Sequence, residues 1–300
     1  MDFEASFHRI YQDYDKYLVI PVIMLLLAVA ALGANYAMKG EVLTKGLDFT
    51  GGTEITYNID SDFSTDEVET AFRNSGRPDA EAVRQVTQND TKLLVRLPPP
   101  DMEQEEAETI LNDAGYDVTV GGFRSISASV SGQFFLQAQL AFVLAFTIMS
   151  LVIFTAFRDL VPALAVILAA AGDVIFAAAG MAVLGIPLTL GSLAALLMLI
   201  GYSVDTDIVL STRVLKRNRG SIESRIWSSV KTGVTMSSGG IAGFAILYIV
   251  STTIVGPSEL SNIAAVMVIG LLADMPFTWF GNAIILKKYV NDEIDVPSWN

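Results

Sequence analysis

The chain has 300 residues, is 52% hydrophobic and carries a formal net charge of −13. This composition is too apolar for an ordinary soluble domain of this length. Cysteine is absent, which excludes disulfides, thiol nucleophiles and thiolate metal sites, and the single histidine, His8, nearly excludes a histidine-based metal site or catalytic triad.

Six apolar stretches are long enough to cross a bilayer, which takes about 20 mostly apolar residues. A polar leader, residues 1–17, precedes the first of them. That stretch is too long for a cleavable signal peptide and lacks a small-x-small cleavage site, so we expect a retained anchor. The fifth stretch has the weakest hydropathy. The predicted spans are 18–38, 134–157, 160–184, 188–210, 234–255 and 260–286.

An acidic segment, residues 39–133, separates the first two predicted spans and holds 18 Asp and Glu against 8 Lys and Arg. Such a surface does not suggest nucleic-acid or anionic-lipid binding; it suits high salt or basic partners. Residues 46–128 contain short elements in the order β-α-β-β-α-β, which is the ferredoxin-like pattern. We therefore expect an α-helical polytopic membrane protein with one α+β ferredoxin-like domain between its first and second helices.

Three glycines lie in the first predicted strand of this domain, within GLDFTGGTEITYNI (46–59). A phosphate-binding P-loop needs Gly-Lys-Ser/Thr at the start of a helix, and here Thr53 and Glu54 follow the glycine pair. The pattern favours a bulge or a close backbone contact instead.

Lysine and arginine gather in alternate short connections, as the positive-inside rule requires of six spans. The clearest cluster is the connection 211–233, predicted as a basic cytoplasmic loop, and two lysines begin the tail 287–300. We therefore expect a multi-pass protein of the cell membrane with both termini in the cytoplasm and the 39–133 domain outside.

Four aspartates lie inside predicted spans. A charged side chain at the bilayer centre costs about 2.5–3.5 kcal/mol on insertion scales, so such residues normally face the interior of a bundle. Burial favours the neutral form of a carboxylate, and a buried aspartate can then bind and release a proton near neutral pH. The predicted proton-relay residues are Asp205 and Asp207, followed by Asp173 and Asp274.

Asp205 and Asp207 are separated by about 200° around a helix, so they cannot both face one neighbouring helix. No Lys or Arg lies within the cores of the spans to pair with the aspartates. Nearby hydroxyls are predicted to support them instead. These are Ser203, Thr206, Ser237 and Ser238. For Asp207 taken by itself, a purely structural role as a hydrogen-bond acceptor stays open, whereas four aspartates on three spans favour a shared polar pathway.

Four segments carry a family resemblance: LDFTGGTEI after the first span, GDVIFAAAG in the third, IGYSVDTDIVLSTRV in the fourth and VMVIGLLADMPFTWFGNAIIL in the last. They resemble the SecF family of protein-export membrane proteins, over about residues 18–288. In the outer domain the matching motif residues are Gly46, Asp48, Phe49, Gly51 and Gly52. Six spans with one large domain after the first is also the layout of this family.

The resemblance implies an accessory role in Sec protein export, without an enzymatic activity, cofactor or metal. It implies four partners: SecD, the Sec translocation channel, an unfolded exported polypeptide and the lipid bilayer. The related RND exporters have about twelve spans in two halves, so this chain is similar to one half. The family's central aspartate falls on Thr206, flanked by Asp205 and Asp207 as in archaeal variants. Which of the two aspartates takes its role is left open.

Parts of the sequence also fit three rival functions. A small-molecule or lipid exporter would need a homodimer to supply twelve spans. An intramembrane aspartyl protease would need Gly-x-Gly-Asp, but residue 170 is Ala, and Pro162-Ala163-Leu164 precedes Asp173 on the same span instead of following it. In a pure scaffold, the aspartates would only hold helices together.

Overall fold

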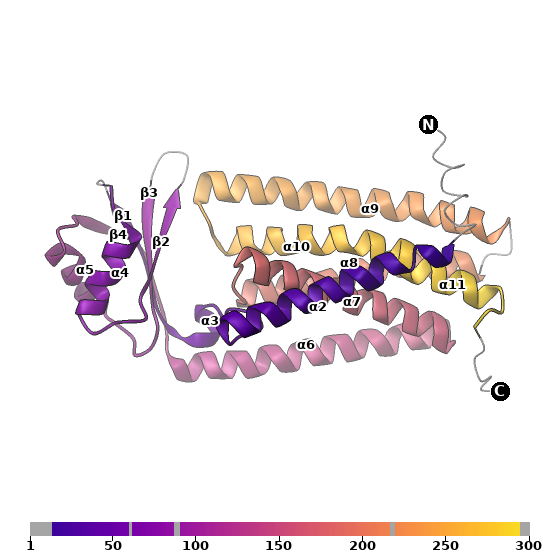
Figure 1. Cartoon of the computed structure of the whole chain (residues 1–300), viewed down its shortest axis with the longest axis horizontal. Helices are drawn as coiled ribbons and strands as arrows, with labels where there is room; N and C mark the ends of the chain where they lie inside the picture. The colour runs from indigo at the N-terminus through magenta and orange to yellow at the C-terminus, as the bar shows by residue number, and fades with distance from the viewer. Residues whose placement is uncertain (1–13, 60–61, 87–90, 217–219, 295–300) are drawn as a thin grey trace.

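Long helices lying side by side form most of the molecule, and a small sheet stands at one end of them (Figure 1). The computed structural model describes residues 14–59, 62–86, 91–216 and 220–294. The start of the first long helix and the end of the last lie at the end away from the sheet (Figure 1), where the Tyr14 hydroxyl donates to the Glu293 carboxylate at 2.6 Å.

Six of the described helices are long and apolar enough to cross a membrane, which confirms the prediction of six such stretches. They are α2 (Val19–Lys39), α6 (Ala128–Phe157), α7 (Leu160–Leu184), α8 (Leu190–Lys216), α9 (Ile222–Val250) and α10 (Glu259–Pro276). A π-helical turn η2 (Ser251–Val255) extends α9, and η3 (Phe277–Asn282) joins α10 to α11 (Ala283–Val290). A 3-10 turn η1 (Tyr14–Lys16) precedes α2.

Helices α7, α8 and α10 form the centre of the bundle. Small residues along α7, among them Ala163, Ala170 and Ala177, are buried and let the neighbouring helices approach closely. On α10, Gly270 faces Leu199 of α8 so closely that a Cβ would lie 2.3 Å from a Leu199 methyl carbon. Helices α2, α6 and α9 lie outside this centre and expose most of their large apolar side chains, as a lipid-facing surface would.

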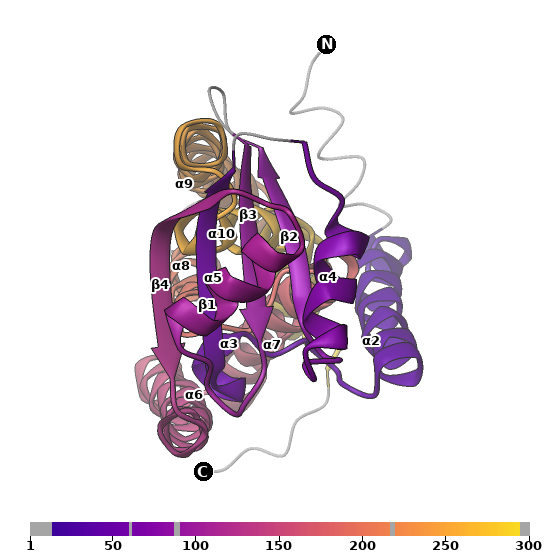
Figure 2. The same ribbon diagram turned by 90° about the vertical axis from the view of Figure 1, so that its left-hand side faces the viewer.

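The sheet domain consists of residues 47–126 and has four strands in the order β2-β3-β1-β4, with all neighbours antiparallel. The strands are β1 (Gly52–Ile59), β2 (Glu81–Val86), β3 (Thr91–Leu97) and β4 (Val118–Ile126). Helices α4 (Thr65–Asn74) and α5 (Gln104–Asp113) cover one face, and the bundle lies beyond the other (Figure 2). The apolar core lies under these helices and includes Tyr57, Phe72 and Leu111.

Three segments differ from the sequence predictions. Residues 47–50 form a short helix, α3 (Leu47–Thr50), where a strand was expected. Helix α6 begins at Ala128, inside the expected outer domain, and the prediction missed residues 128–133 because they are mostly small or polar. The expected basic loop 211–233 is helical up to Lys216 and again from Ile222.

The glycine pair after α3 marks a close backbone contact, as the sequence suggested. Gly51 and Gly52 have φ angles of 75° and 112°, which L-residues with side chains rarely adopt. A Cβ on Gly52 would lie 2.2 Å from the carbonyl oxygen of Leu97, so β1 approaches β3 more closely than any other residue allows.

A candidate functional site of buried carboxylates

Asp173, in the middle of α7, is the first of the buried carboxylates along the chain. Its side chain is fully buried and faces α8, where the Ser203 hydroxyl donates a hydrogen bond to Asp173 Oδ2 at 2.5 Å. Ser203 and Asp207 are one helical turn apart and therefore lie on the same face of α8. The face of α8 that meets Asp173 thus also presents the next carboxylate.

Asp207 and Asp274 are also fully buried, and one hydroxyl joins them. The Thr278 hydroxyl lies 2.9 Å from Asp207 Oδ1 and 3.3 Å from Asp274 Oδ1. Asn282 donates a second hydrogen bond to Asp207 Oδ1 at 2.8 Å, and Ser237 of α9 donates to Asp274 Oδ2 at 3.2 Å. Four elements, α8, α9, α10 and η3, therefore meet at these two carboxylates.

The end of α10 explains how the last span reaches Asp207. Asp274, Thr278 and Asn282 follow one another at four-residue intervals, so they form a polar stripe on one face. Pro276 lies inside this segment and the chain continues as the π-helical turn η3. Pro lacks an N–H donor, and π-turns of this kind often occur where a helix carries functional residues.

The three carboxylates lie together without a cationic side chain of the described residues beside them. Asp207 and Asp274 share the Thr278 hydroxyl, and Asp173 meets the same face of α8 through Ser203. None of the ion pairs found in the described part of the chain involves these three aspartates. Asp173 Oδ1 and Asp207 Oδ2 are buried and accept no hydrogen bond from the described residues. Three ionised carboxylates in this environment would repel one another strongly, and protonation relieves the repulsion.

The structure separates the predicted site residues into two groups. Asp173, Asp207, Asp274, Ser203 and Ser237 come together in the cluster. Asp205 and Ser238 lie on exposed surfaces of α8 and α9. Thr206 is buried, but its hydroxyl donates back to the Tyr202 carbonyl at 3.4 Å, and its methyl group lies beside Gly233 of α9.

Thr278 and Asn282 belong to the site, although the sequence analysis did not name them. Both are buried and both donate to Asp207. The signal that identifies them is the four-residue spacing from Asp274 within an apolar stretch. A hydroxyl and an amide on the same face as an intramembrane aspartate indicate partners for a carboxylate.

The motif residues of the sheet domain lie far from this cluster, at the junction with the bundle. The Asp48 side chain is 3% exposed and forms an ion pair with Arg124 of β4. Its other oxygen accepts a hydrogen bond of 2.9 Å from the backbone N–H of Leu190, the first residue of α8. The Gly46 N–H donates to the Leu188 carbonyl at 2.8 Å.

Six long apolar helices, a small sheet at one end and an acidic cluster buried between the central helices define a polytopic membrane protein with an ionisable core. The family model described as "Protein export membrane protein SecD/SecF, C-terminal" matches residues 106–292. The protein-export membrane protein SecF of Methanothermobacter thermautotrophicus is 38% identical over 284 residues, covering 94% of each chain. SecF of Haloferax volcanii is 36% identical over 282 residues, which are 92% of this chain and 94% of that protein. The chain belongs to the SecF family of protein-export membrane proteins.

A solved structure shares the fold. The crystal structure of SecDF from Thermus thermophilus, described as a translocon-associated membrane protein, superposes with a TM-score of 0.75 at 20% sequence identity. The match covers 97% of this chain but only 39% of the SecDF chain. The chain therefore spans about two fifths of the length of that protein.

Proposed function

We propose that this protein is an accessory membrane subunit of the Sec export machinery, and that it uses the proton gradient to promote the translocation or release of exported proteins. The relatives named SecF, at 32–38% identity over most of the chain, support the export role. SecDF is translocon-associated and is much longer than this chain, which supports SecD as the partner that supplies the remaining part. The Sec channel and an unfolded polypeptide complete the proposed assembly.

The proposed orientation places the sheet domain, as a ferredoxin-like domain, outside the cell and the opposite end of the bundle in the cytoplasm. The strand order β2-β3-β1-β4 with two helices on one face supports the ferredoxin-like description. Arg213 and Lys287 lie near the bundle end away from the sheet, where Lys287 pairs with Glu223 at 2.9 Å. Positive charge at this end supports a cytoplasmic location.

The observation that carries the coupling is the Thr278 hydroxyl between two buried carboxylates. A hydroxyl has one hydrogen, so Thr278 can donate to only one of Asp207 and Asp274 at a time, while its oxygen can accept from the other if that carboxyl is protonated. A proton on Asp207 therefore favours donation from Thr278 to Asp274, and a proton on Asp274 favours the reverse. The pair exchanges a proton by reorganising one hydroxyl.

Ser203 brings Asp173 into the cluster, because its hydroxyl donates to Asp173 Oδ2 at 2.5 Å and it lies one helical turn from Asp207 on the same face of α8. The cluster thus links α7, α8 and α10 through side-chain hydroxyls that hydrogen-bond to carboxylates. A charge that crosses 100 mV is worth about 2.3 kcal/mol, enough to shift a two-state equilibrium about fiftyfold. Proton binding here would shift the packing of the central helices and, through them, the sheet domain.

The test is pulse-chase export of a secreted precursor in cells that lack this protein and are complemented by variants. Asp207→Asn keeps the shape of the side chain but removes the ionisable group, and we expect export to fall to the level of the empty vector. Asp205→Asn is the matched control, because it removes the same charge from the exposed face of the same helix. Both variants must insert and assemble to wild-type levels. Full export by Asp207→Asn would disprove the coupling and leave a scaffold.

A further inference from the structure

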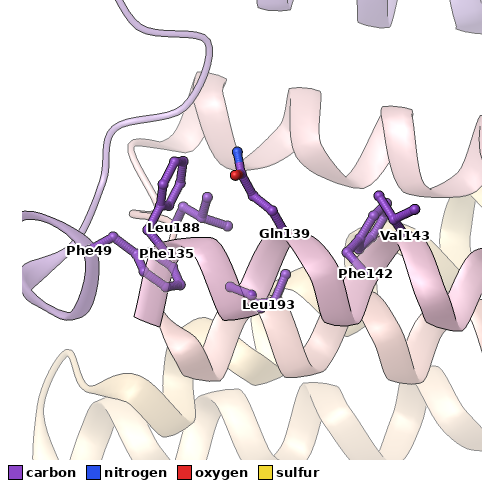
Figure 3. Close-up of a pocket in the computed structure, with 8 residues that line it drawn as sticks. Phe49, Phe135, Gln139, Phe142, Val143, Leu188 and Leu193 are labelled. Atoms are coloured by element: carbon purple, nitrogen blue, oxygen red, sulfur yellow. The ribbon is translucent and has the colours of Figure 1, made fainter. Parts of the chain in front are cut away.

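The sheet domain is held to the bundle chiefly on one side, around α3. The strand-like segment before α3 pairs with the connection between α7 and α8: Leu188 N–H donates to the Thr44 carbonyl and Gly46 N–H donates to the Leu188 carbonyl, both at 2.8 Å. Phe49 packs edge-on against Phe135 of α6, with ring centroids 5.6 Å apart. Figure 3 shows Phe49 beside Phe135 and Leu188 at one end of an apolar groove along α6.

Away from α3, polar space separates the uncovered face of the sheet from the bundle. A crevice of 360 Å³ lies between them, lined by Glu54 and Arg96 of the sheet and by Pro187 and Glu259 of the bundle. A second cavity of 200 Å³ adjoins it and includes Gln85, whose side chain donates to the Pro257 carbonyl at 3.2 Å. A polar gap of this kind lets the two parts change their distance without breaking an apolar core.

Asp48 is the buried polar group that crosses the joint. One carboxylate oxygen pairs with Arg124 inside the sheet domain, and the other accepts from Leu190 N–H in the first turn of α8. The first N–H groups of a helix have no partner within the helix and carry its positive dipole end, so a carboxylate there is stabilising. The carboxylate is 3% exposed, so water does not compete well for these contacts.

Helix α8, which Asp48 caps, also carries Asp207 of the acidic cluster. Leu190 and Asp207 belong to one uninterrupted helix, α8. Seventeen residues separate them, a distance of about 26 Å along the axis at 1.5 Å per residue. Because α8 is continuous from Leu190 to Asp207, a shift of the helix along its axis would move both residues together.

We propose that Asp48 is a positioning residue that ties the sheet domain to the first turn of α8, and that this tie transmits movement of α8 to the domain. The inference rests on the proposed function for its source of movement, but the tie itself does not depend on it. It also gives the GLDFTGG motif a mechanical role: Gly46 lets the chain lie against Leu188 and Thr189, Asp48 caps α8, and Gly51 and Gly52 turn the chain directly into β1.

The test measures distances between spin labels in the full chain, reconstituted in lipid vesicles. The absence of cysteine allows labels at chosen positions. Thr70→Cys on α4 and Leu184→Cys at the end of α7, both exposed, report the distance between domain and bundle. Thr70→Cys with Asn112→Cys on α5 reports the integrity of the sheet domain.

Two variants break the tie from opposite sides. Asp48→Ala removes the acceptor. Leu190→Pro removes the N–H donor, replaces a side chain that is already exposed and changes no residue of the sheet domain, and Pro is well tolerated at the first position of a helix. We expect both to broaden the Thr70–Leu184 distances and leave Thr70–Asn112 unchanged. The matched control is Glu54→Ala, which breaks the Glu54–Arg96 ion pair of 2.9 Å beside the same crevice and should not broaden the distances.

Transmission is tested by adding Asp207→Asn, which imitates the protonated carboxyl. We expect it to shift the Thr70–Leu184 distance in the native background and to lose this effect with Leu190→Pro. A shift that survives Leu190→Pro would overturn transmission through the tie and leave proton coupling intact. If Asp207→Asn does not shift the Thr70–Leu184 distance in the native background, the conformational step of the proposed function is refuted. The attachment through Asp48 would then be supported only by the broader distances in Asp48→Ala and Leu190→Pro. Unchanged distances in both variants would overturn the tie.

Discussion

Gly172 and Phe277 pack so closely that a Cβ on residue 172 would lie 2.6 Å from the Phe277 ring. Gly172 precedes Asp173 on α7, and Phe277 precedes Thr278 on η3. The contact between these two residues therefore sets how far the carboxylate of Asp173 lies from the hydroxyl that joins Asp207 and Asp274. The packing of the last span against α7 and the geometry of the acidic cluster depend on the same contact.

We expect Gly172→Ala to weaken this packing, because overfilling a well-packed site costs about 1–3 kcal/mol. The measurement is thermal unfolding of the purified protein in detergent, together with export in complemented cells. Phe277→Leu should restore both in the Gly172→Ala background, because it removes the ring atoms that the new methyl group meets. If Phe277→Leu gives no rescue, the contact does not set the position of α7 against η3.

The Thr278 hydroxyl should be required for export, while its methyl group should not. Thr278→Val keeps the volume of the side chain and removes the hydrogen bonds to Asp207 and Asp274. We expect export to fall sharply with little loss of inserted protein. Thr278→Ser keeps the hydroxyl and should retain most of the activity. Equal export by the two variants would show that the shared hydroxyl has no part in the coupling.

The long helices could be predicted because a run of about 20 apolar residues has few other stable structures. The choice between Asp205 and Asp207 as the buried residue could not be predicted. Their spacing shows that they point apart, but which one faces inward depends on the rotation of α8, which is set by packing against α7 and α10. Gly270 against Leu199 is one contact that fixes this rotation, and neither residue carries a signal of its partner in the sequence.

Local signals also fail at α3 and at η3. The four residues of α3 alternate in hydrophobicity as a strand would, but contacts with α6 and with Leu190 override that tendency. Thr278 and Asn282 lie after Pro276, where a helix is expected to end or kink. Their relation to Asp274 becomes visible only when the helical spacing is continued past the proline.

Gly46 should tolerate a side chain only if Thr189 becomes smaller. A Cβ at residue 46 would lie 2.5 Å from the Thr189 methyl group, so we expect Gly46→Ala to separate the sheet domain from α8 and to impair export. Thr189→Ser removes that methyl group and keeps the hydroxyl, which donates to Glu259 at 2.8 Å. The double variant Gly46→Ala/Thr189→Ser should therefore recover both export and the native distance between the sheet domain and the bundle. The readouts are export and the Thr70–Leu184 spin-label distance, and a double variant as defective as Gly46→Ala would contradict this packing.

The orientation of the chain can be tested with single cysteines, because the native sequence has none. Thr70 on α4 and Asn291 after α11 are both exposed, and helices α4 and α11 lie at opposite ends of the molecule (Figure 1). A membrane-impermeant maleimide added to intact cells should label Thr70→Cys and leave Asn291→Cys unlabelled. Permeabilised cells should show labelling of both, which controls for access to the thiols. The reverse pattern in intact cells would place the sheet domain in the cytoplasm, and a domain on that side could not act on an exported chain after it leaves the channel.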